Sequence, residues 1–144
     1  MKEKKIKVSI HQPDFLSYIG FFNKINKSDI FVILDDVRMS KSGWTHRDQI
    51  KTISGAVWLT IPIKKIKNEK KIRLTEINNN NNWKSKHLNL IYENYKKAQF
   101  FDETFDMLKE IYSFNTNKLI EFNLNTIKKI FKILNIKKKN YFFE

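Results

Sequence analysis

The stretch from residue 6 to residue 34 sets the strongest constraint on how this chain can fold. Residues 6–10 alternate apolar and polar side chains, as a half-buried strand does, and residues 15–25 place apolar side chains three and four positions apart, as one helix face does. Residues 30–34 are continuously apolar, which is typical of a strand covered on both faces. A strand, a helix and a strand in this order need a parallel, right-handed crossover. The pattern predicts an α/β fold with a mostly parallel, Rossmann-like sheet on the N-terminal side.

The segment that follows the crossover predicts a hairpin. Residues 37–53 are polar and show no clear period, so we expect them to be irregular. The sequence VWLTIPI at residues 57–63 predicts a third strand. Residues 71–77 alternate enough to predict a fourth strand, paired with the third across a lysine-rich loop at residues 64–70.

The C-terminal half of the chain predicts helices. Apolar side chains recur at helical spacing in three segments within residues 83–135. Residues 78–82 are all asparagine, and we expect a linker without a packing role there. Residues 141–143 predict the beginning of a further strand. Together these patterns predict a single domain over residues 1–144, with the strand–helix–strand unit and the hairpin in the first 77 residues.

The charge of the chain raises the question of a nucleic-acid partner. There are 28 lysines and arginines against 15 aspartates and glutamates, which gives a net charge of +13. Clustered basic side chains bind nucleic-acid phosphates. Only three of the 28 are arginines, however, and the lysines are scattered among many asparagines and isoleucines. We therefore expect no nucleic-acid partner, and keep a basic nucleic-acid-binding protein only as a minor alternative.

Two absences in the sequence exclude further classes. The chain has no cysteine, so neither a disulfide nor a thiolate metal site can form. No apolar run reaches the roughly 18 residues that a membrane-spanning helix needs. We expect a cytoplasmic protein without a membrane span.

The candidate catalytic residues follow the first two predicted strands. His11 ends the first strand, and Asp35 and Asp36 follow the second. Because the carboxyl ends of parallel strands lie at one edge of a sheet, where ligands of such sheets bind, these side chains are expected there together. His11 is the acid–base candidate, and one of the two aspartates would orient it. Two carboxylates are too few for a hard-cation site, so no metal site is predicted, and the cofactor is left open.

A basic and aromatic cluster predicts where an anionic substrate binds. Lys41, Arg47 and Lys51 surround Trp44 in sequence, and such cations can hold a diphosphate while an aromatic ring stacks on a base or sugar. The candidate binding residues are Gln12, Tyr18, Lys24, Lys41, Trp44, Arg47 and Lys51. Tyr18 is more typical of a core position than of a binding one. Trp58 and His87 are expected to be buried.

Five segments resemble the WbqC-like family of bacterial proteins. They are HQPDFLSYIGFFNKINKSDIFVILDDV at residues 11–37, Trp44 with RDQIK at 47–51, WLTIP at 58–62, WKSKHLNLIYENYKKAQFF at 83–101, and the asparagine-bearing helix around 122–124. Such proteins are typically encoded among genes for surface polysaccharides such as O-antigen.

The resemblance implies a role in surface-glycan biosynthesis. It favours a transferase that moves an acyl or aminoacyl group and binds a nucleotide-linked amino sugar or a similar anionic donor, alongside other glycan-biosynthesis proteins. The sequence departs from the family at Ser17, where a second proline is usual, and at Asp48, where asparagine is frequent. Members also usually continue beyond this C-terminus, so we expect a shortened member. The alternative is a catalytically inactive member that acts as a binding or scaffold partner.

Overall fold

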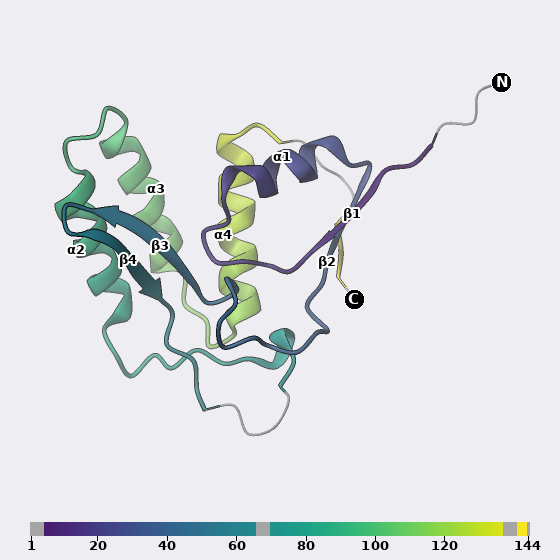
Figure 1. Cartoon of the computed structure of the whole chain (residues 1–144), viewed down its shortest axis with the longest axis horizontal. Helices are drawn as coiled ribbons and strands as arrows, with labels where there is room; N and C mark the ends of the chain where they lie inside the picture. Colours follow the sequence, from purple (N-terminus) through teal and green to yellow (C-terminus); the bar gives the residue numbers. More distant parts are fainter. Residues whose placement is uncertain (1–4, 66–69, 137–140, 144) are drawn as a thin grey trace.

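The N-terminal unit is a small parallel sheet with one helix. The structure, a computed structural model, describes residues 5–65, 70–136 and 141–143. Its first elements are β1 (Val8–His11), α1 (Ile19–Lys27) and β2 (Ile30–Ile33), and the last, β5 (Tyr141–Phe143), returns to the same sheet (Figure 1). The strand order is β1-β2-β5, and both pairings are parallel. The predicted crossover and the terminal strand are confirmed.

The fold class is confirmed only at the level of mixed α/β. The parallel sheet has three short strands, and the other sheet is a separate antiparallel pair. This arrangement does not define a Rossmann fold. The physical reason is that the chain leaves the sheet after β2 and returns to it only at β5, so the parallel sheet holds three strands in the described residues.

Helix α1 begins later than the apolar spacing predicts. Residues 14–18 form a turn instead of the first helical turn, with Leu16 in the left-handed region at φ 45°. The backbone N–H of Phe15 donates to the carbonyl of Trp44 at 3.1 Å, a tertiary bond that a helical Phe15 would not make. The fully buried Phe15 thus joins the core through a loop, and α1 starts at Ile19.

The hairpin forms between different segments from those predicted. It joins β3 (Arg47–Thr52) to β4 (Gly55–Thr60), so the partner strand precedes β4 and lies within the segment expected to be irregular. Residues expected to form the fourth strand include a short 3-10 helix, η1 (Ile72–Leu74). A single bridge from Ile63 to Ile77 is what remains of the predicted pairing. The sequence pattern did not predict β3 because most of its residues are polar and only one of its faces is partly buried. Part of the predicted lysine-rich loop, at 66–69, lies outside the described residues.

The predicted helical region is confirmed. Its elements are α2 (Trp83–Tyr95), α3 (Phe101–Ser113) and α4 (Leu119–Ile133). In Figure 1, α2 and α3 lie beside the hairpin, and α4 runs between that group and the α1 side of the molecule. None of the described helices is both long and apolar enough to cross a membrane.

Helix α4 connects two apolar cores. The larger core, beneath the hairpin and helices α2 and α3, includes Leu59, Ile111 and Phe122. The smaller core lies between α1 and the parallel sheet and includes Ile127 and Phe131 of α4. Because one helix contributes to both, it fixes the hairpin side relative to the sheet side, and the cavity described below lies between them.

Of the two side chains expected to be buried, His87 is buried and Trp58 is exposed. His87 is buried, and its Nδ1 lies 3.1 Å from the hydroxyl of Tyr112, as expected for a satisfied core histidine. Trp58 was expected in the core but is 40% exposed. It lies on the open side of the hairpin, where the guanidinium of Arg47 covers its ring at 4.3 Å.

Candidate functional site

A cavity of about 450 Å³ opens at the carboxyl end of β1. The loop after β1, the turn before α1 and the beginning of β3 form its walls. Its lining residues are His11, Asp14, Phe15, Ser17, Tyr18, Trp44 and Asp48. Of the residues that the sequence singled out for a site, the cavity thus brings together His11, Tyr18 and Trp44.

The histidine of this cavity is paired with a carboxylate. His11 Nδ1 lies 3.7 Å from Asp14 Oδ2 and 2.9 Å from the carbonyl oxygen of Gln12. A carbonyl can only accept, so in the neutral ring this contact favours the proton on Nδ1 and leaves a lone pair on Nε2. The edge of the ring also meets Phe21, at 5.2 Å between centroids. The imidazole is therefore held in one orientation with a basic nitrogen available.

Both acidic groups that line the cavity have a raised pKa. Burial raises the pKa of Asp14 above its ordinary value, and the nearby His11 and the hydroxyl of Thr45 only partly oppose it. Burial likewise raises the pKa of Asp48, whose Oδ1 accepts a 2.7 Å bond from the backbone of Gln49. Both groups can accept hydrogen bonds from hydroxyl or amino groups of a ligand.

Exposed aromatic rings border the cavity. Trp44 is 51% exposed and Tyr18 67%, so both rings can stack on a planar base or the C–H face of a sugar. Trp44 also lies 5.3 Å from Trp58, whose ring carries Arg47. Trp44 is exposed enough for the stacking role predicted for it. Trp58 extends this aromatic surface to the guanidinium of Arg47.

The ring of Tyr18 packs directly against Gly20. A Cβ added at Gly20 would lie 2.2 Å from Cε2 of Tyr18, so the ring lies directly over the helix backbone at that position. Glycine has a low helix propensity, and its presence inside α1 is explained by the ring of Tyr18, which leaves no room for a Cβ. Tyr18 in turn lines the cavity.

Asp35 and Asp36 do not supply the partner of His11 expected from the sequence. Both follow β2 at the expected sheet edge, where the N–H of Leu34 donates to the carbonyl of His11 at 2.9 Å. Asp36 instead forms ion pairs with Lys71 and Arg73, which lower its pKa. Asp35 is buried, and burial raises its pKa. The segment that contains Lys71 and η1 folds back over this end of β2. The side chains of Lys71 and Arg73 therefore pair with the carboxylate of Asp36.

None of the predicted cations is among the lining residues of the cavity. Lys24 donates to the carbonyl of Ile10, one residue before His11, at 3.0 Å. Arg47 Nη2 donates to the carbonyl of Ser42 at 2.8 Å. Lys41 and Lys51 are exposed further along the loop and the hairpin. The expected cluster of three cations beside Trp44 thus reduces to Arg47 on one side, with Lys24 near β1.

Two residues tie the walls of the cavity together. Gln12, expected to bind substrate, accepts a 3.4 Å bond from the hydroxyl of Thr45. Asn123, fully buried on α4, donates to the carbonyls of Pro13 and Thr45, each at 2.7 Å. The sequence analysis missed Asn123 as a site residue, although an asparagine within the apolar pattern of a helix is a usable signal.

Sequence reasoning also missed the two carboxylates that line the cavity, Asp14 and Asp48. The sequence pattern did not single out Asp14, and Asp48 was noted only as a departure from the family pattern. Nothing in the local sequence distinguishes them from ordinary loop carboxylates. In the part of the chain that the structure describes, no three histidine, aspartate or glutamate side chains gather closely enough to hold a metal ion.

Fold and cavity together define a small α/β protein with an aromatic-bordered histidine–carboxylate pocket at the end of a parallel strand. The chain belongs to the WbqC-like protein family, whose model matches residues 12–143. It is also 36% identical over 107 residues to the uncharacterized protein Rv1507c of Mycobacterium tuberculosis. That alignment covers 74% of this chain and 46% of the relative, so the chain spans about half the length of the curated relative it matches. No solved structure matches the chain.

Proposed function

We propose that this chain is a group transferase of bacterial surface-glycan biosynthesis, which binds a nucleotide-linked amino sugar and acts in the cytoplasm. Membership of the WbqC-like family supports the pathway. The chemistry of the cavity supports the reaction type. The observation that carries the proposal is the contact of His11 with Asp14 and the Gln12 carbonyl beneath exposed aromatic rings.

The sugar ring fits between the aromatic rim and the carboxyl groups. Trp44 and Tyr18 offer apolar faces, and Asp14 and Asp48 offer acceptors for hydroxyl and amino groups. The diphosphate of the donor would extend past Trp44 toward Arg47, with Lys24 near β1 as a second cation. Arginine suits this role because its planar fork can hold phosphate oxygens in pairs.

His11 would act as the acid–base group in acyl or aminoacyl transfer. The amino group of the sugar attacks the carbonyl carbon of an acyl donor, and Nε2 of His11 accepts the proton that the nitrogen loses. The new C–N bond forms as the bond to the leaving group breaks, and the proton passes from His11 to that leaving group. Asp14 would be a positioning residue, because its carboxylate stabilises the imidazolium formed in between.

One alternative has a specific observation in its favour. A catalytically inactive binding or scaffold member of the same pathway would need the aromatic pocket but no assembled phosphate cluster. None of the four candidate cations, Lys24, Lys41, Arg47 and Lys51, is among the lining residues of the cavity, which fits that description. The two candidate functions differ in the effect of replacing His11, which should lower turnover in a transferase and can change only binding in a scaffold protein.

A thermal melt against ligand panels tests the proposal. The chain is melted with nucleotides, nucleotide-linked sugars and acyl carriers, and positive combinations are incubated and analysed by mass spectrometry for transferred acyl groups. Trp44→Ala should abolish the ligand-induced shift in Tm, whereas His11→Gln should keep much of the shift and lose product formation. Full product formation by a folded His11→Ala variant would contradict the acid–base assignment. Binding without turnover in the wild type would favour the scaffold alternative.

A further inference from the structure

A second cavity, of about 610 Å³, lies between the segment that begins α2 and the segment before α4. Its lining residues are Asn79, Asn80, Asn81, Asn82, Trp83, Lys84, Asn115, Thr116 and Asn117. None of them lines the His11 cavity. The polyasparagine segment, expected to be a linker without a packing role, thus forms one wall of a pocket.

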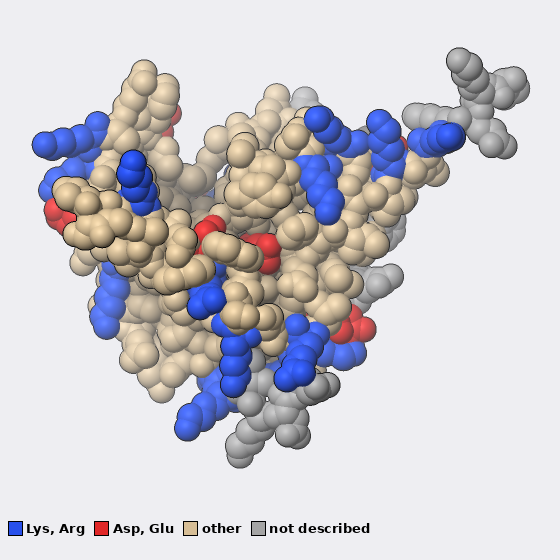
Figure 2. Space-filling model, in the orientation of Figure 1, with Lys and Arg blue, Asp and Glu red and all other residues tan. Residues whose placement is uncertain are grey.

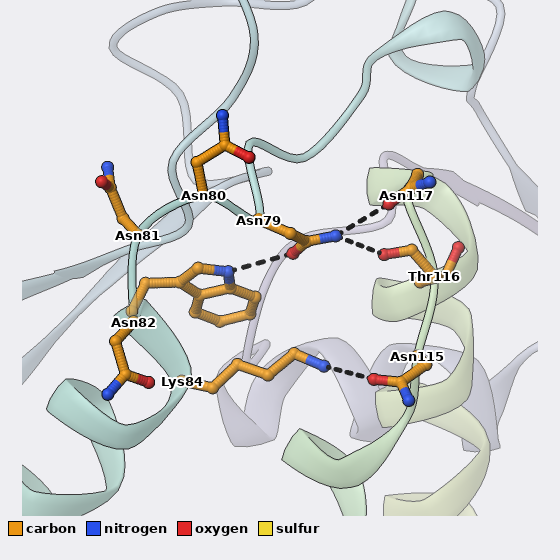
Figure 3. A pocket seen from close by; sticks show the side chains of 9 residues that line it. Asn79, Asn80, Asn81, Asn82, Lys84, Asn115, Thr116 and Asn117 are labelled. Carbon is orange, nitrogen blue, oxygen red and sulfur yellow. Dashed lines mark hydrogen bonds between the residues drawn. The ribbon is translucent and has the colours of Figure 1, made fainter.

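The wall is built before any ligand arrives. Asn79 accepts a 3.3 Å bond from Nε1 of Trp83 and donates to the Thr116 carbonyl at 3.1 Å and to Oδ1 of Asn117 at 2.9 Å (Figure 3). These bonds join two segments almost forty positions apart in the sequence. Asn80 and Asn81 point away from this bridge, toward the outside of the loop. The pocket is therefore a fixed surface with further amide groups at its rim.

The chemistry of the wall favours a ligand with many hydroxyl groups. Six asparagines line it. The amide of Asn79 is used by its three bonds, and the other five amides carry donor hydrogens that a ligand can use. A sugar hydroxyl is both donor and acceptor, so it can be satisfied by such an amide. The Thr116 hydroxyl donates to the carboxylate of Glu121, which is not itself a lining residue. The described lining residues themselves include no aspartate or glutamate.

Among the residues that the structure describes, the ammonium of Lys84 in this pocket has no carboxylate partner. Lys84 Nζ donates to the carbonyl of Phe114 at 2.6 Å and lies 3.5 Å from Oδ1 of Asn115. Its ammonium also lies 5.8 Å from the ring centre of Trp83 and 5.9 Å from that of Phe122. Desolvation lowers its pKa, and among the described residues no carboxylate offsets that burial. An ammonium has three donor hydrogens, so one remains for an anion.

The first turn of α2 adds to the same positive field. It contains no acidic residue, and its N-cap Asn82 makes no side-chain capping bond. Free N–H groups at a helix N-terminus favour negative charge close by. The helix end, the ammonium of Lys84 and the amide hydrogens thus converge on one pocket.

We propose that this pocket binds a sugar that carries a single anionic group, with the anion on Lys84 and the hydroxyls on the asparagine amides. The anionic group can be a carboxylate, as in a uronic acid, or a phosphate, as in a sugar phosphate. The site is independent of the transferase proposal, because it shares no lining residue with the His11 cavity.

Calorimetric titration of the whole chain tests the site with four probes: glucuronate, glucose 1-phosphate, glucose and inorganic phosphate. At least one charged sugar should bind more tightly than both glucose and inorganic phosphate, and the stronger of the two names the source of the anion. Lys84→Met keeps the apolar stem and should weaken that binding about tenfold, the usual effect of losing a charge-assisted bond. Lys86→Met, on an exposed position of the same helix outside the pocket, is the matched control and should leave it unchanged.

A second variant separates loss of the site from loss of the fold. Asn115→Asp places a carboxylate next to Lys84, so it should strengthen that contact, leave the melt cooperative and abolish binding of the charged sugars. Titration of His11→Ala should give the wild-type affinity, which distinguishes this pocket from the proposed transferase site. Failure of both charged sugars to bind, equal binding of glucose or inorganic phosphate, or binding unchanged in Lys84→Met would each overturn the proposal.

Discussion

The side-chain amide of Asn123 lies 2.7 Å from the carbonyl oxygen of Thr45, and it bonds Pro13 at the same distance. Pro13 belongs to the loop after β1, and Thr45 to the loop before β3. One fully buried side chain on α4 therefore holds both walls of the His11 cavity. The backbone bond from Phe15 to Trp44 closes the same gap at 3.1 Å. The cavity is a product of the central helix as much as of the sheet.

Replacing Asn123 tests this clamp. Asn123→Ala leaves two buried carbonyls without their donor, and each unsatisfied group costs about 1–3 kcal/mol, so the free energy of unfolding should fall by roughly 2–6 kcal/mol. Urea denaturation measures the loss. Lys128→Ala, at an exposed position of the same helix, is the control and should change stability by less than about 0.5 kcal/mol. Equal stability of the two variants would show that the clamp is unimportant.

Asp14 and Asp36 should respond in opposite directions to the same substitution. Burial raises the pKa of Asp14 in the folded state, so its charged form destabilises the fold above the ordinary value of 3.8. Asp14→Asn should therefore raise the free energy of unfolding at neutral pH and lose that advantage below pH 3.8. Ion pairing with Lys71 lowers the pKa of Asp36, so Asp36→Asn should slightly destabilise the fold at neutral pH.

Denaturation at pH 7 and pH 3 measures both effects, and ligand binding adds a functional readout. Only Asp14→Asn should alter the binding or turnover found in the ligand panel, because Asp36 does not line the cavity. If Asp36→Asn lost function while Asp14→Asn kept it, the carboxylate assignment of this structure would be wrong.

Buried His87 should make the fold sensitive to acid. Burial lowers its pKa from 6.5 to about 4, so the folded state resists protonation that the unfolded chain accepts. This contribution is fully present above pH 6.5 and is lost as the pH falls toward 4, by up to about 3 kcal/mol. His87→Gln, which stays neutral and can still bond Tyr112, should flatten that part of the stability curve.

The measurement is the free energy of unfolding of both proteins between pH 7 and pH 4. The difference between wild type and His87→Gln isolates the histidine from the carboxyl groups that titrate in the same range. A difference that does not change over this interval would mean that His87 is protonated as easily in the fold as outside it.

Gly20→Ala should change the cavity more than the fold. The new Cβ would meet the ring of Tyr18, which is exposed and can swing aside, so the helix keeps its alanine gain of up to about 1 kcal/mol. The Tm should stay level or rise, while binding of the ligand found in the panel should weaken. In a Tyr18→Ala background, Gly20→Ala should have no effect on binding. A binding loss of the same size in that background would assign the effect to something other than Tyr18.

The sequence by itself determined the elements that depend on local periodicity. The strand–helix–strand crossover, the three helices of residues 83–135, the strand at 141–143 and the burial of His87 follow from apolar spacing. The motif around His11 also sufficed to indicate the family. Such features are predictable because each residue's environment repeats with the period of its own helix or strand.

Only the tertiary structure decided which distant residues meet. The partner of β4, the start of α1 after a loop-bound Phe15, and the choice of Asp14 over Asp35 or Asp36 beside His11 all depend on contacts between separate segments. Asn123 is the clearest case, since its two acceptors lie 110 and 78 positions away along the chain. A buried amide must find partners wherever the folded backbone leaves unpaired carbonyls, and that location is a property of the packed structure that no local pattern carries.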